Sequence, residues 1–80
     1  MVREELVEME KAEDATKDEV KKRFGVKVTD VVIESTELTV VANILVYEIK
    51  GFASLSGEEW YFKAQVNAES GKVVGFKDER

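Results

Sequence analysis

The sequence predicts one small α+β domain in which an N-terminal helix packs on a four-stranded antiparallel sheet. Three observations predict it: a helical period over residues 2–24, a change to β-branched and aromatic residues after Gly25, and turn residues that divide the rest into four extended segments. Eighty residues are enough for one domain and few for two. We therefore expect a single domain over residues 1–80, with a helical arm at 1–15, a helix at 16–24 and the sheet at 26–78.

The N-terminal segment has one apolar face. Its members recur every three or four residues and are Val2, Leu6, Met9, Ala12, Thr16, Val20 and Phe24. Glu13 interrupts this face, and the residues from Thr16 to Glu19 have the pattern of a capping box, in which Thr16 would begin a new helix. The pattern allows one helix or two with a break near residues 13–16, ended in either case by Gly25.

The remainder reads as four strands joined in chain order. We expect them at residues 26–34, 38–53, 58–68 and 72–78. The breaks between them are polar or contain glycine, and the last, at residues 68–72, suits a type I turn closed by a left-handed Gly71. Because neighbouring segments are joined by short turns, the predicted sheet is an antiparallel meander.

Alternation along each strand predicts which side chains face the helix. The inward set is Leu45, Tyr47, Ile49, Trp60, Phe62, Ala64, Val66, Ala68, Val74 and Phe76. The opposite face still carries apolar residues, including Val73, beside charged ones. A solvated sheet face is normally more polar, so we expect part of it to be covered by a partner, by a second copy or by the N-terminal arm. The candidate protein-binding face consists of Ile44, Val46, Phe52, Tyr61 and Lys63.

Composition limits which classes of partner the chain can bind and where in the cell it is expected. The net charge of −5 disfavours nucleic acid and anionic membranes, and no apolar run approaches the ~20 residues of a membrane span. Without a signal-peptide pattern the chain as written is expected in the cytoplasm, or outside it if the sequence is a trimmed mature domain. Scarce Asn and Gln beside many charges resemble proteins of thermophiles.

The residues needed for most catalysis are missing. The chain has no His and no Cys, so the usual proton shuttle, thiol nucleophile and zinc ligands are lacking. Ser70 and Lys72 lie in an exposed turn, where the lysine would stay protonated, and the five glycines form no phosphate-binding loop. We expect no enzyme activity, no metal and no cofactor. Tyr61 with Lys50 and Lys63 could stack bases, but the acidic net charge favours an ordinary surface.

Two segments resemble the PepSY domain. Residues 47–51 are similar to that family's Tyr-x-Val strand, and residues 60–74 to its strand ending in Asp-Ala-x-Thr-Gly-Lys-Val, with Asn67 in place of Asp and Ser70 in place of Thr. Including the helix, the resemblance covers about residues 14–76. It implies a cystatin-like fold and a role in binding or restraining peptidases, in proteins that are secreted or membrane-anchored. Residues 39–43 also resemble the inhibitory hairpin of cystatins, although Asn43 replaces its glycine.

The leading functional hypothesis is a noncatalytic protein- or peptide-binding module that uses the outer sheet face or a free strand edge. One alternative is a small-ligand carrier with a cavity between helix and sheet, lined by Trp60 and Tyr47. Another is a self-assembling structural module, for example a homodimer, or an engineered scaffold without a ligand.

Overall fold

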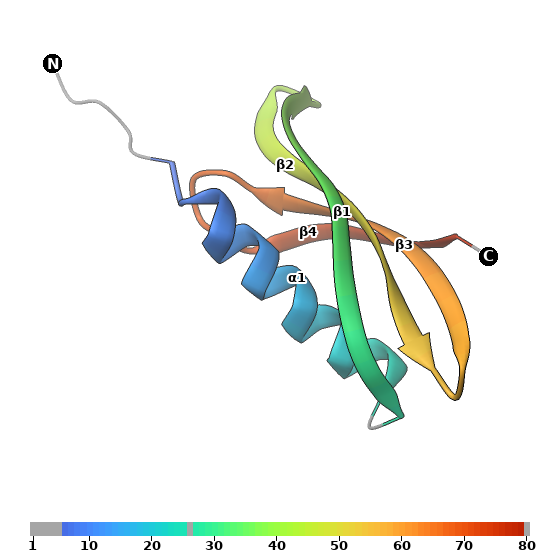
Figure 1. Ribbon diagram of the computed structural model, residues 1–80. Helices are drawn as coiled ribbons and strands as arrows, with labels where there is room; N and C mark the ends of the chain where they lie inside the picture. Colours follow the sequence, from blue (N-terminus) through green and yellow to red (C-terminus); the bar gives the residue numbers. More distant parts are fainter. Residues whose placement is uncertain (1–5, 26, 80) are drawn as a thin grey trace, which may run out of the picture.

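The structure is a computed structural model that describes residues 6–25 and 27–79. Its five elements are α1 (Met9–Phe24), β1 (Val28–Val41), β2 (Ile44–Leu55), β3 (Glu58–Asn67) and β4 (Val73–Glu79). The strands form one antiparallel sheet in the order β1-β2-β3-β4, and α1 lies along one face of it (Figure 1). This confirms the predicted fold class.

Helix α1 is continuous across residues 13–16, so the alternative with two helices is wrong. Thr16 is fully buried, and its hydroxyl donates to the carbonyl of Ala12 within the helix instead of capping a new one. Burial of the stripe Ala12, Thr16 and Val20 on the sheet outweighs the local capping pattern. Residues 6–8 precede the helix, and the expected helical start at Val2 lies outside the described residues. Gly25 ends α1 as predicted, with a φ of 85° and its N–H bonded to the carbonyl of Lys21.

The first hairpin differs most from the prediction. The expected break at residues 34–37 is wrong because β1 runs through it, and the chain turns at Ala42 and Asn43. Both turn residues have positive φ, 50° and 64°, as in the two-residue type I′ turns that join twisted strands. Polar residues 34–37 suit a strand here because β1 is at the sheet edge, and most of them are exposed.

The other two connections follow their predicted chemistry. Ser56 and Gly57 form a second two-residue turn with positive φ. In the last connection Gly71 has a φ of 78°, and the side-chain oxygen of Asn67 accepts the backbone N–H groups of Glu69 and Ser70. The Asn that replaces the family's Asp therefore performs the same turn-forming role.

Strand β4 is shifted relative to the expected register. Val66 pairs with Val73 and Gln65 pairs with Gly75, so Val74 is an extra residue in a β-bulge. Val73 packs on the core whereas Val74 is 54% exposed, the reverse of the prediction. Phe76 stays opposite Ala64 and faces the core as predicted, because the bulge restores the register.

The core consists of two clusters beneath α1. The first contains Ala12, Tyr47, Ile49, Val66 and Ala68, and the second contains Val20, Ala53 and Phe62. Ile33 packs against both. Trp60 is only partly buried and meets Phe24 edge-on, with ring centroids 5.9 Å apart. The inward assignments of β2 and β3 are thus confirmed.

The helix is too short to cover the whole sheet. Its 16 residues span about 24 Å, whereas the 14 residues of β1 span about 46 Å. The closed end of the β1–β2 hairpin projects beyond the ends of β3 and β4 (Figure 1). Any apolar side chain at this end must therefore remain exposed or be covered by something else.

Candidate protein-binding surfaces

Phe52 and Tyr61 form an aromatic pair on the sheet face opposite α1. They are directly paired across β2 and β3, and their ring centroids are 5.5 Å apart. Tyr61 is 44% exposed and Phe52 is partly buried. Lys63 follows on the same face of β3, opposite Lys50 and Lys77. Three of the five predicted site residues therefore lie together.

The phenol of Tyr61 lies beside acidic groups. Its hydroxyl donates to Glu59 Oε1 at 3.3 Å. The negative charge of Glu59, with a smaller contribution from Glu34, disfavours the phenolate and raises the pKa of Tyr61 above its ordinary value. The carboxylates therefore move deprotonation of the Tyr61 hydroxyl further into the alkaline range.

The other two predicted residues do not join this pair. Ile44 is eight residues from Phe52 along β2, a distance of about 26 Å, and it lies at the hairpin end. Val46 is 1% exposed and lies between Thr39 and Asn67 of the flanking strands. Its side chain is not available for contact with a partner in this conformation.

The hairpin arm, residues 38–45, is the most exposed apolar feature of the chain. Leu38, Val40, Val41 and Ile44 are 46%, 64%, 38% and 42% exposed. From the sequence, Ile44 was assigned to the candidate binding face, and Val40 and Val41 lie in the segment 39–43 that resembles the cystatin hairpin, but the turn itself was expected elsewhere. The two-residue spacing of Val41 and Ile44 around Ala42-Asn43 is the sequence signal that would have located the arm.

Strand β1 is an edge strand, since among the strands of residues 6–25 and 27–79 only β2 adjoins it in the sheet. Its pairing is irregular between Val28 and Asp30 and between Ile33 and Ser35, and it is regular from Ser35 to Val41. The regular part leaves one row of backbone groups unpaired by the sheet. Such an edge is a template for an added strand.

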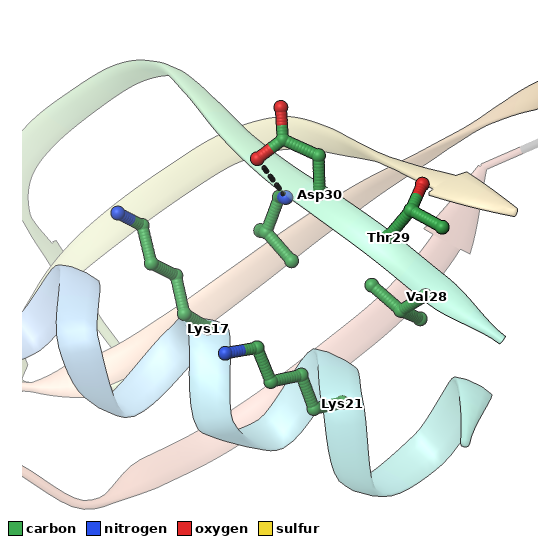
Figure 2. Close-up of a pocket in the computed structure, with 6 residues that line it drawn as sticks. Lys17, Lys21, Val28, Thr29 and Asp30 are labelled. Atoms are coloured by element: carbon green, nitrogen blue, oxygen red, sulfur yellow. Dashed lines mark hydrogen bonds between the residues drawn. The ribbon is translucent and has the colours of Figure 1, made fainter. Parts of the chain in front are cut away.

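A groove of about 300 Å³ separates the first part of β1 from α1 (Figure 2). Lys17 and Lys21 extend into it from the helix, and Thr29 and Asp30 line it from the strand (Figure 2). The Asp30 carboxylate accepts the backbone N–H of Val31 at 2.9 Å. In the described part of the chain, the only ion pair joins Glu19 and Arg23, so neither groove lysine is neutralised by a carboxylate.

Glu13 links α1 to the middle of β1. Its carboxylate accepts the hydroxyl proton of Thr36 at an oxygen separation of 2.6 Å. This contact explains why a glutamate lies next to the buried stripe of the helix, and it fixes the strand at the start of its regular edge. The sequence marked Glu13 as an interruption but could not show its partner.

A second hollow, of about 270 Å³, lies over β3 and β4 and is lined by Lys63, Gln65, Gly75, Phe76 and Lys77. Neither this hollow nor the groove is lined by Trp60 or Tyr47. The hydroxyl of Tyr47 instead donates to the carbonyl of Val7. Within residues 6–25 and 27–79, no three carboxylates gather as a metal site would require. No helix in the same ranges has the length and hydropathy of a membrane span.

These features define the class of protein: a small α+β domain with one helix on an antiparallel meander, an open edge strand and an exposed apolar hairpin. The chain belongs to the PepSY family, whose model, described as "Peptidase propeptide and YPEB domain", matches residues 9–77. Comparison with curated proteins and with solved structures found no significant match. PepSY domains are propeptide or regulatory domains. A noncatalytic module is consistent with membership of this family.

Proposed function

We propose that this chain is a noncatalytic regulatory module that binds a peptidase and restrains it, and that an extended segment of the peptidase adds to the β1 edge. The family description names peptidase propeptides, which supports the choice of partner. A propeptide acts where its peptidase matures, so the proposal favours the extracytoplasmic alternative for location.

The observation that carries the proposal is the open β1 edge. Seven consecutive residues, Ser35 to Val41, are in regular register with β2, and no strand of the described residues lies on their other side. An added strand would gain main-chain hydrogen bonds along this stretch, and its side chains would alternate between the two sheet faces. The opposite edge is less suitable because the bulge at Val74 leaves only Gly75 to Glu79 of β4 in regular register.

A second candidate surface is the aromatic pair Phe52 and Tyr61 with Lys63. It is supported by the exposure of Tyr61, whose hydroxyl donates to Glu59. Aromatic residues with a polar tip are frequent in the centres of protein interfaces. A partner at this surface would contact the sheet face and leave the β1 edge open.

The test has two stages. The purified domain is titrated by calorimetry into metallo-, serine, cysteine and aspartic peptidases, and the rate of substrate hydrolysis is followed. We expect binding and slower hydrolysis for at least one peptidase. Backbone amide hydrogen exchange in that complex should then slow between residues 35 and 41.

The result separates the alternatives. Protection centred on residues 52 and 61–63 would move the interface to the outer sheet face. Absence of binding in all four classes would contradict the proposed function. Growth in mass with concentration, measured by light scattering on the domain alone, would instead support the self-assembling module.

A further inference from the structure

We propose, building on the proposed function, that the hairpin arm inserts into an apolar cleft of the partner protein and that the rim of this cleft is basic. The arm is residues 38–45, and its four exposed apolar side chains are those of Leu38, Val40, Val41 and Ile44. This names the kind of partner surface the domain selects.

The arm is apolar on both of its faces. Leu38 pairs with Tyr47 and Val40 with Leu45, so these side chains share the face that α1 covers further along the sheet. Val41 pairs with Ile44 on the other face. A flat surface could bury only one of these sets, whereas a cleft with two walls buries both. A cleft is therefore the shape that the arm complements.

The charges around the arm indicate the sign of the charge at the rim of the partner's cleft. Residues 38–47 carry no charge, and the run is bounded by Glu37 and Glu48, which are directly paired across β1 and β2. Two like charges in this position repel each other and reduce hairpin stability. Basic groups around a partner's cleft would relieve that repulsion and favour the encounter.

The same acidic pair disfavours two other occupants. In a dimer formed through the arms, the pair of one copy would approach the pair of the other, and like charges would meet. An anionic lipid surface would be repelled in the same way. Helix α1 cannot cover the arm because it reaches only about half the length of β1.

The experiment uses the whole chain and the peptidase identified by calorimetry. The double variant L38T/V40T places threonine, a β-branched residue that suits a strand, at both positions and makes the arm polar. V74T makes the same valine-to-threonine change at an exposed residue of β4. We expect L38T/V40T to weaken binding about tenfold or more and V74T to change it less than about twofold. Circular dichroism and the urea midpoint confirm that each variant is folded.

The acidic pair is tested with E37Q/E48Q. We expect slower association and a weaker dependence of the association rate on salt than in the wild type. Wild-type affinity in L38T/V40T would overturn the inference while leaving the proposed function in place. Failure of the wild type to bind any peptidase would remove both.

Two further measurements can overturn the choice of occupant. Binding of the wild type to phosphatidylcholine or phosphatidylserine vesicles that L38T/V40T abolishes would assign the arm to a membrane. Concentration-dependent dimerisation that L38T/V40T abolishes would assign it to a second copy. We expect neither.

Discussion

At the scale of single residues, Glu59 controls the acidity of Tyr61. The carboxylate disfavours the phenolate, so we expect E59Q to lower the pKa of Tyr61 towards its ordinary value. E34Q should act in the same direction and less strongly, since Glu34 is the weaker cause. The ring resonances of Tyr61, followed by NMR through an alkaline titration, give the pKa directly. An unchanged pKa in E59Q would show that another group raises it.

The hydrogen bond between Glu13 and Thr36 should couple the stability of α1 to that of β1. We expect E13A and T36V, each of which removes one partner of the bond, to lower the free energy of unfolding by about 1 kcal/mol, with the double variant losing less than the sum. Urea unfolding of the four proteins gives the coupling energy. E10A, the same change at an exposed glutamate of the helix, is the control and should lose less, since only its interaction with the helix dipole is removed. Strict additivity would mean that the bond contributes nothing.

The identity of single residues predicted local backbone conformation better than it predicted which residues contact each other across the fold. Gly25 ends the helix as expected, and Gly71 has the positive φ expected of it. Thr16 lay in both the predicted helical stripe and the capping pattern, and only its burial against the sheet decides for the stripe. Likewise, nothing near Glu13 in the sequence points to Thr36, which is 23 residues away.

Among the elements, β2 depends on Gly51. A β-carbon there would overlap the carbonyl oxygen of Val32 in β1, a backbone atom that cannot move alone. We expect G51A to lower the free energy of unfolding by about 3 kcal/mol, measured as a shift of the urea midpoint. G75A is the matched control, because its β-carbon would meet only the flexible side chain of Gln65. Equal losses in the two variants would argue against this close approach.

The turn of the first hairpin can be improved. Ala42 has a φ of 50°, which costs roughly 1 kcal/mol for a residue with a β-carbon and nothing for glycine. We therefore expect A42G to raise the free energy of unfolding by about 0.5 kcal/mol after the loss in chain entropy is included. Thermal unfolding followed by circular dichroism measures it. A lower midpoint would mean that the entropy term prevails.

The number and order of elements were predictable, but the first turn was not. Residues 34–37 are polar and look like a turn, whereas Ala42 and Asn43 lie within an apolar run. An edge strand accepts polar residues such as 34–37, and the hairpin beyond the helix exposes apolar ones. Hydropathy therefore predicted a turn where the strand continues and a strand where the chain turns. The β4 bulge was missed because one extra residue leaves Phe76 facing inward either way.

For the whole molecule, Ile33 is the residue that joins the two core clusters. We expect I33A to lower the free energy of unfolding by about 2 kcal/mol, at the low end for such changes because the side chain is only partly buried. In the wild type, Trp60 fluorescence and the Tyr47 ring resonances should report the same urea midpoint. Separate midpoints would show that the clusters unfold independently.

The predicted binding face was only partly assembled by the fold. Phe52, Tyr61 and Lys63 lie together as predicted. Predicting this required only the alternation of side chains along β2 and β3 and the register between these two strands. Ile44 was assigned to the right face, yet it belongs to the arm, since distance along a long strand is invisible without the position of the turn. The arm itself depends on the mismatch in length between α1 and β1, which no local pattern encodes.

The two irregularities in β1 have a consequence for storage and expression. Fibrils grow when long, flat edges pair repeatedly between copies of a chain. Here the extra residues near Thr29 and Glu34 bend the edge and divide it, so a neighbouring molecule finds only seven regular residues to pair with. Pairing between copies along this edge of 14 residues is therefore confined to Ser35–Val41, the same stretch to which the proposed partner strand adds.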